Sequence, residues 1–212
     1  AGDDTLSGRL GGDVLSGGAG DDVINPGAGS DIVFGGEGVD TLAYSSSGTG
    51  VVVSLGYGSD IFYQDTFGSG LDAIFEIENL TGSDFGDSLT GNAGDNVIDG
   101  GAGADVLSGG AGDDTLIGGA GSDTVTYVAA NAGVTVSLAL TTAQDTVGAG
   151  SDTLSGFENL TGSAFNDTLT GDGNNNVIDG GAGNDTITVN LDFTTLLSNG
   201  EAAGSIVAGD GN

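Results

Sequence analysis

The stretch GGAGDDVIN, residues 17–25, contains a glycine-rich start, two aspartates and an aliphatic residue, and close copies of it recur along the chain. Numbered from Gly17, the nine-residue repeat has glycine at places 1, 2 and 4, aspartate at place 6 and an aliphatic residue at place 8. Self-similarity at a short fixed period indicates a solenoid. Three arrays keep this phase, and their sixth places are Asp4, Asp13, Asp22, Asp31 and Asp40; Asp87, Asn96, Asp105, Asp114 and Asp123; and Asp167, Asn176 and Asp185.

One nonapeptide has the residues for one loop and one short strand. Glycine permits the positive φ angles of a tight loop, and the triplet around place 8 turns its aliphatic side chain to one face of a strand. Two nonapeptides then make one flattened coil, and stacked coils form two parallel sheets with the aliphatic residues between them. The sequence therefore predicts an all-β parallel β-roll, or β-helix solenoid, whose alternate loops line opposite edges. The expected edge sets are Asp4, Asp22, Asp40 and Asp13, Asp31; Asp87, Asp105, Asp123 and Asn96, Asp114; and Asp167, Asp185 and Asn176.

A longer repeat overlies the short one. DTLAY at 40–44 returns as DTVTY at 123–127, and ENLTGS at 78–83 returns at 158–163. The runs VVVSL and VTVSL between the arrays are rich in β-branched residues and predict strands. The segments DAIFEIENLT and DTLSGFENLT predict paired short strands joined by a tight turn, in coils without a metal. The expected organisation is a first array 1–44, linking coils 45–81, a second array 82–127, linking coils 128–161, a third array 162–188, and an irregular tail with the start of a further repeat, 189–212.

The charge is extremely one-sided, with 31 acidic residues against one cation, Arg9, and a net charge of -30. Nucleic acid is excluded as a partner because its phosphates need a basic face, and no apolar run reaches the roughly 20 residues of a membrane span. Each nonapeptide buries about one aliphatic side chain, worth about 1.5 to 3 kcal/mol. Ordering its backbone costs roughly 1 to 2 kcal/mol per residue. The acidic loops must therefore bind a cation if the solenoid is to hold together.

Calcium fits these loops because it takes six to eight carboxylate and carbonyl oxygens. The chain lacks the His and Cys that zinc prefers, and magnesium demands a rigid octahedral site. Asparagine keeps one oxygen but no charge, so sites at Asn96 and Asn176 are expected to be weaker. Pairing loops along the edges predicts roughly five to nine ions. The fifth-place acids are expected to face solvent or a second shell of the sites: Asp3, Asp21, Asp95 and Asp113.

These repeats resemble the repeats-in-toxin (RTX) family of hemolysin-type calcium-binding proteins. Four stretches of this chain match the nonapeptide of that family fully: GGAGDDVIN, GGAGADVLS, GGAGDDTLI and GGAGNDTIT. The resemblance implies folding triggered by calcium and type I secretion through a C-terminal signal. The chain departs from the family's repeat at four positions. Arg9 stands at a second place, Pro26 stands at a first place, and Asn96 and Asn176 stand at sixth places. The resemblance also implies that carbonyls of loop glycines join the sixth-place residues as metal ligands: Gly18, Gly20, Gly27, Gly29, Gly36, Gly38, Gly101, Gly103, Gly110, Gly112, Gly119, Gly121, Gly181 and Gly183.

Catalysis is not expected, because the chain has no His, Lys or Cys and the repeat accounts for nearly every aspartate. Both ends of the sequence look like pieces of a repeat, so a longer parent protein is expected. Two functions remain open. One is a module of a large secreted bacterial adhesin or surface-layer protein, extracellular or on the cell surface, packed against neighbouring repeat modules or other copies of itself. The alternative is the C-terminal folding and secretion domain of an exoenzyme such as a protease or lipase.

Overall fold

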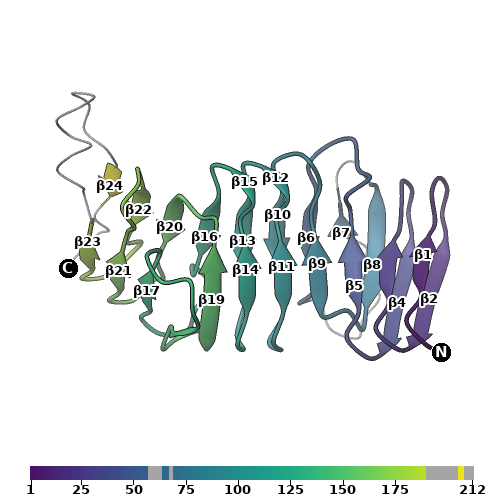
Figure 1. Cartoon of the computed structure of the whole chain (residues 1–212), viewed down its shortest axis with the longest axis horizontal. Coiled ribbons are helices and arrows are strands. Elements are labelled where there is room, and N and C mark those ends of the chain that lie inside the picture. Colours follow the sequence, from purple (N-terminus) through teal and green to yellow (C-terminus); the bar gives the residue numbers. More distant parts are fainter. Residues whose placement is uncertain (57–63, 67–68, 190–204, 208–212) are drawn as a thin grey trace.

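The nonapeptides form a solenoid in which each glycine-rich loop is followed by a short strand on one of two opposite faces (Figure 1). The computed structural model describes residues 1–56, 64–66, 69–189 and 205–207, and these contain strands but no helix. Pairing within each sheet is parallel except at two short strands of the links. The predicted all-β parallel roll is confirmed. Nearly all of the expected tail, 189–212, lies outside the described residues.

Face 1 begins with a sheet to which the arrays contribute alternate strands, apart from the links. Its order is β1 (Thr5–Ser7), β3 (Val23–Asn25), β5 (Thr41–Ala43), β9 (Asn79–Thr81), β11 (Val97–Asp99), β14 (Thr115–Ile117), β19 (Ser151–Ser155) and β18 (Gln144–Asp145). A three-stranded sheet continues this face, with β17 (Thr135–Ser137), β21 (Thr168–Thr170) and β23 (Thr186–Thr188).

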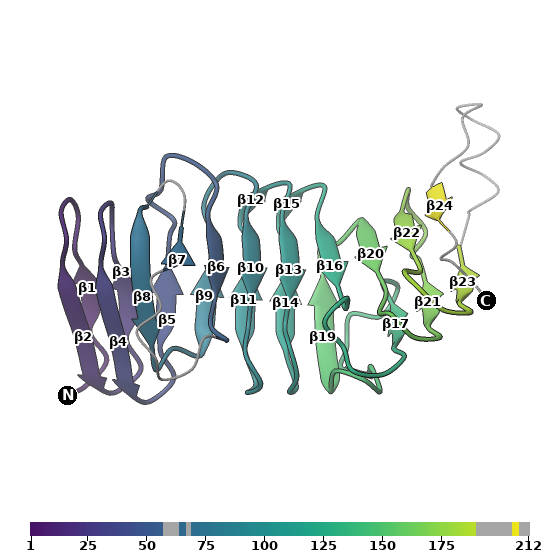
Figure 2. The same cartoon turned by 180° about the vertical axis from the view of Figure 1, so that it is seen from behind.

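Face 2 lies behind it, as the reverse view shows (Figure 2). It starts with β2 (Val14–Ala19), β4 (Ile32–Glu37), β8 (Leu71–Phe75) and β7 (Gln64–Asp65). It continues with β6 (Val52–Ser54), β10 (Ser88–Thr90), β13 (Val106–Ser108), β16 (Thr124–Thr126), β20 (Asn159–Thr161), β22 (Val177–Asp179) and β24 (Ser205–Val207). Two loop segments also pair, β12 (Ala102–Gly103) and β15 (Ala120–Gly121). Loops leading into face 1 form edge 1, and loops leading into face 2 form edge 2.

The core is a double row of eighth-place side chains between the faces. On face 1 the register joins Leu6, Ile24, Leu42 and Leu80 in one line, and face 2 repeats the pattern with Leu89 against Leu107. Most of these side chains are completely buried, while their seventh-place neighbours face outward. The alternation follows from the two-residue period of a strand.

The two links insert extra strands on opposite faces. In the first link, β8 pairs with β4 and β6 pairs with β10, both on face 2. In the second, β19 pairs with β14 and β17 pairs with β21, both on face 1. The array between the links has five sixth-place residues, an odd number, so the second link starts from the opposite face.

A glutamine side chain joins the two parts of the sheet at each link. Gln64 accepts the N–H of Ser54 at 2.7 Å and donates to the Ser54 carbonyl at 3.0 Å. Gln144 makes the same pair of bonds to Ser137. The side-chain amide thus supplies the donor and the acceptor that a neighbouring strand would supply. The turns before β9 and β20 are tight, as predicted, with positive φ at Glu76 and Gly156.

We expect Leu107→Ala to destabilise the calcium-saturated protein by about 2–5 kcal/mol, because it leaves a cavity in a fully buried row. Val106 is the matched control, since it precedes Leu107 in the same strand and its side chain is 40% exposed. Val106→Ala should change the free energy of unfolding by about 0.5 kcal/mol or less. Urea unfolding at constant calcium measures both, and equal losses would contradict this core.

Candidate metal centre

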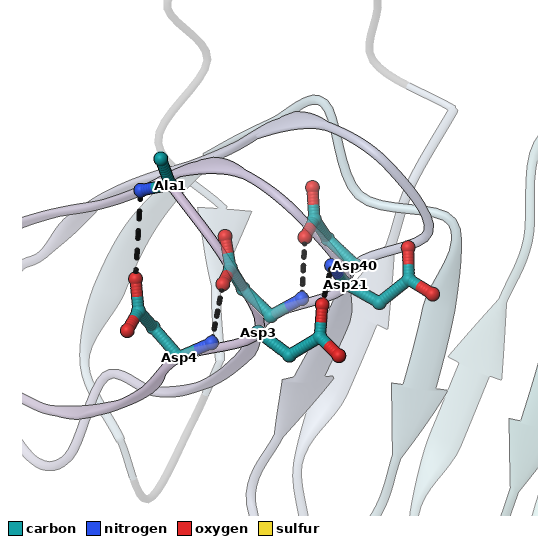
Figure 3. Close-up of polar contacts among 6 residues, drawn as sticks. Ala1, Asp3, Asp4, Asp21 and Asp40 are labelled. Carbon is teal, nitrogen blue, oxygen red and sulfur yellow. Dashed lines mark hydrogen bonds and ion pairs between the residues drawn. The ribbon is translucent and has the colours of Figure 1, made fainter.

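The sixth-place aspartates of neighbouring coils form a hydrogen-bonded ladder along each edge. On edge 1 the N–H of Asp4 donates to Oδ1 of Asp22 at 2.7 Å, and the N–H of Asp22 donates to Oδ1 of Asp40 at 2.9 Å. Figure 3 shows Asp4 and Asp40 on this edge. Edge 2 has the same contact from Asp13 to Asp31 at 2.8 Å. The later arrays repeat it, which confirms the predicted edge sets: Asp87 to Asp105, Asp105 to Asp123, Asn96 to Asp114, and Asp167 to Asp185.

The second carboxylate oxygen of most of these aspartates is buried and receives no hydrogen bond. A buried polar atom without a partner costs free energy, and an ionised one costs more. A cation would provide the missing interaction. The aspartates whose Oδ2 is in this position are Asp13, Asp22, Asp31, Asp40, Asp105, Asp114, Asp123 and Asp185.

The glycine at the first place makes room for this oxygen. A Cβ on Gly35 would lie 2.5 Å from Oδ2 of Asp40, and a Cβ on Gly100 would lie 2.6 Å from Oδ2 of Asp105. A larger residue with this backbone at either of these two places would push the carboxylate out of its loop. The first place is not always glycine, since Pro26 stands five residues before Asp31, whose Oδ2 is also buried.

The glycines at the second and fourth places have positive φ angles. In the loop of Asp22 these are 107° at Gly18 and 124° at Gly20, a conformation that glycine adopts without strain. All eight loops with an unpartnered Oδ2 have positive φ at both places. Arg9 adopts it too, with φ 74° and an exposed side chain. We name these eight the open loops.

Four sixth-place residues predicted as ligands lie in loops of a different kind. In these loops a backbone N–H from the same loop, four residues earlier, donates to the side-chain oxygen. The N–H of Ser83 donates to Oδ2 of Asp87 at 2.6 Å, and Asn92 donates to Oδ1 of Asn96 at 2.8 Å. The third array repeats both contacts, from Ser163 to Asp167 and from Asp172 to Asn176. Their role as metal ligands stays a prediction.

Two buried aspartates of the links were not expected in the ladder. Asp72 accepts the N–H of Asp31 at 3.0 Å, and Asp152 accepts the N–H of Asp114 at 3.1 Å, so both occupy sixth places. The sequence held one signal for these sixth places. A glycine stands two residues before each aspartate, at Gly70 and Gly150, as it does in the arrays. The longer insertion before them hides the nine-residue phase.

Two glutamates extend the ladder across the shortened loops. Oε2 of Glu78 accepts the N–H of Asp40, and Oε2 of Glu158 accepts the N–H of Asp123, both at 2.8 Å. These loops have lost three residues relative to the repeat, and the longer side chain spans the difference. The recurrence of ENLTGS was the sequence signal for both.

Burial raises the pKa of two ladder aspartates in the second array, Asp105 and Asp114. Loss of solvation raises the pKa of Asp114 to about 7, with Asp152, Asp95 and Asp113 adding repulsion. Loss of solvation likewise raises the pKa of Asp105 to about 6. A bound cation would reverse both effects by favouring the charged form.

The side chains alone do not complete a metal site. Within the described residues, no three acidic, histidine or cysteine side chains gather into a group that could hold an ion. Each open loop contributes one sixth-place carboxylate, and calcium also accepts backbone carbonyl oxygens and water as ligands. The fifth-place Asp3, Asp21, Asp95 and Asp113 are exposed, as expected.

The comparisons agree with this chemistry. A family model described as the RTX calcium-binding nonapeptide repeat matches four segments, residues 7–42, 81–116, 90–125 and 152–187, which together cover more than half of the chain. A comparison with curated proteins found no match to the chain. The described residues include no helix that is long and apolar enough to cross a membrane.

We expect acid to favour the fold when calcium is absent. Raised pKa values mean that the folded chain binds protons more tightly than the unfolded chain. Stability without metal should therefore increase as pH falls from 8 to 5, and should be lost as pH rises through about 6 and 7, the pKa values of Asp105 and Asp114. Circular dichroism in chelator at pH 8 and pH 5 measures this.

The variant Asp105→Asn/Asp114→Asn should weaken this response to pH, because asparagine does not titrate. Asp21→Asn is the control, since Asp21 is an exposed fifth-place residue and is not among the charged groups that raise the pKa of Asp105 or Asp114. A β-sheet signal that falls on acidification of the chelated chain would contradict the interpretation.

Proposed function

Because the chain belongs to the RTX calcium-binding nonapeptide repeat family, we propose that it is a calcium-dependent folding module of a large secreted bacterial protein of the adhesin or surface-layer type. The proposal has three parts, which are calcium-coupled folding, export before folding, and a structural rather than catalytic role outside the cell.

The observation that carries calcium-coupled folding is the set of eight buried oxygens without a donor. They belong to a chain with a net charge of -30 and a core two side chains thick. Such a chain is strongly self-repelling in its compact state. The metal-free fold is therefore unfavourable at neutral pH, and binding energy becomes folding energy.

In this mechanism the sixth-place aspartates of the open loops would hold the ion, together with carbonyls of the second-place and fourth-place glycines. Bound calcium supplies positive charge and accepts six to eight oxygens. The protein's own part is to keep Oδ1 hydrogen-bonded to the backbone N–H of the preceding coil while Oδ2 stays free inside the loop. First-place glycines such as Gly35 keep the space for that oxygen.

Export and extracellular location are supported by the family, whose members are typically secreted. A chain that stays unfolded where calcium is scarce is suited to export, because folding then waits for the calcium outside the cell. The longer repeat supports a module that extends a larger protein. Its links allow new arrays to be added while the register of both faces is kept.

A non-catalytic role is supported by the residue types at hand. The sequence contains no His, Lys or Cys, so the usual nucleophile and base pairs cannot be built. The buried aspartates are fixed in the ladder by Oδ1. They are therefore occupied by a repeated structural contact.

We expect the chelated chain at pH 8 to be largely unfolded and to gain β-sheet when calcium is added, with magnesium much less effective because it demands rigid octahedral geometry. Circular dichroism and hydrodynamic radius measure the transition. A fold that is unchanged after all metal is removed at this pH would sink the proposal.

A neighbouring pair of variants tests the residue assignment. Asp22→Ala should shift the calcium midpoint several-fold upward, because Asp22 is buried with a free Oδ2. Asp21→Ala should shift it little, because Asp21 is exposed at the fifth place. Equal shifts would contradict the assignment of ligands to the sixth place.

A further inference from the structure

We propose that the loops beside the two links are closed by the chain's own hydrogen-bond donors and hold no calcium, so that each link is a metal-independent joint between calcium-loading arrays. This inference rests on the proposed calcium-dependent folding and assigns which loops take part in it. The closed loops are those ending at Asp72, Asp87, Asn96, Asp152, Asp167 and Asn176.

Both carboxylate oxygens of Asp87 already accept hydrogen bonds from the chain. Oδ2 accepts the N–H of Ser83 at 2.6 Å, while Oδ1 accepts the Ser83 hydroxyl at 2.8 Å and the N–H of Val51 at 2.7 Å. Asp167 has the same three donors, two from Ser163 and one from Val134. Both carboxylates are buried, and their charge is balanced by donors of the chain.

The asparagine loops are closed in a second way. Oδ1 of Asn96 accepts the N–H of Asn92, and its Nδ2 donates to the carbonyl of Glu78 at 2.6 Å. Asn176 likewise donates to the carbonyl of Glu158 at 3.1 Å. The amide nitrogen thus lies where it consumes a backbone oxygen, and an N–H₂ group cannot ligate a cation.

The link aspartates are closed by hydroxyl groups. Oδ2 of Asp72 accepts the hydroxyls of Tyr44 and Thr66, both at 3.0 Å, and Oδ2 of Asp152 accepts the hydroxyl of Tyr127 at 2.9 Å. In the open loops this same oxygen has no donor. The buried tyrosines therefore take the position that a cation takes elsewhere in the ladder.

Backbone conformation separates the two kinds of loop. Every open loop has positive φ at places 2 and 4, whereas none of the four array loops that are closed has positive φ at either place. With a residue such as Ser83 at place 2, the N–H points at the carboxylate. With glycine and positive φ, that N–H does not contact the carboxylate, and the oxygen stays free.

The closed loops also gather in space around the links, on both edges. There the core is enlarged by buried side chains that do not belong to the eighth-place rows, including Tyr44 and Tyr127 at the ends of two arrays and Ile77 and Phe157 in the links. Apolar burial and satisfied hydrogen bonds thus replace the metal over the same coils. The chain is divided into three calcium-loading arrays with two joints between them.

The decisive experiment opens a closed loop and counts ions. Ser83→Gly/Phe85→Gly restores glycine at places 2 and 4 beside Asp87, and Phe85 is partly exposed, so its loss costs little packing. Equilibrium calcium binding to the full chain should rise by about one ion per chain. Ser83→Ala is the control, because it removes the hydroxyl but keeps the side chain's Cβ and the N–H donor, and it should add no ion.

A second pair guards against misfolding of the first. Asp105→Asn should lower the number of bound ions, whereas Asp87→Asn should leave it unchanged at saturating calcium, although it weakens the fold. The proposed metal-independent joints would be wrong if both substitutions lowered the number of bound ions equally. They would also be wrong if the double glycine variant bound no additional ion. If the wild-type chain bound no calcium at all, the proposed function itself would fail, which is a separate result.

Discussion

The structure depends on burying one carboxylate in each coil along each edge. A parallel solenoid repeats its loops at a fixed spacing, so identical side chains from successive coils must stack. Here the stacked residue is aspartate, and its Oδ1 accepts a backbone N–H of the preceding coil. The ladder that fixes the coils thereby also forces like charges together. What neutralises Oδ2 then decides whether each loop is stable.

Two solutions to this constraint occur in the same chain. In open loops, residues with positive φ at places 2 and 4, all of them glycine except Arg9, leave Oδ2 without an N–H donor, and the oxygen is left for a cation. In loops near the links, a serine amide or a tyrosine hydroxyl donates to it. The first solution makes the stability of a loop depend on the calcium concentration, and the second makes it independent of calcium. Their distribution along the chain determines which parts respond to calcium.

Much of this architecture could be predicted from the sequence, because a nine-residue period fixes it. Placing Asp4 and Asp22 on one edge needs only two strands per coil, and the stacked core needs only the phase of residues such as Ile24. The faces of the links were not predicted, since they depend on counting the odd array between them. The closed loops were harder still to predict, because Asp87 and Asp105 both stand at sixth places of the repeat. They differ in the residue at place 2, which is Ser83 in one loop and Gly101 in the other, and this residue decides whether its N–H points at the carboxylate.

The links alternate between the two faces because an odd number of nonapeptides separates them. Each link inserts extra strands on one face only, at β6 to β8 and later at β17 to β19. With β17 to β19 on face 1, the extra strands of the two links lie on opposite faces, although the links share their sequence pattern. An even number of nonapeptides between the links would place both insertions on face 2. The number of nonapeptides in the array therefore decides the face of the following link.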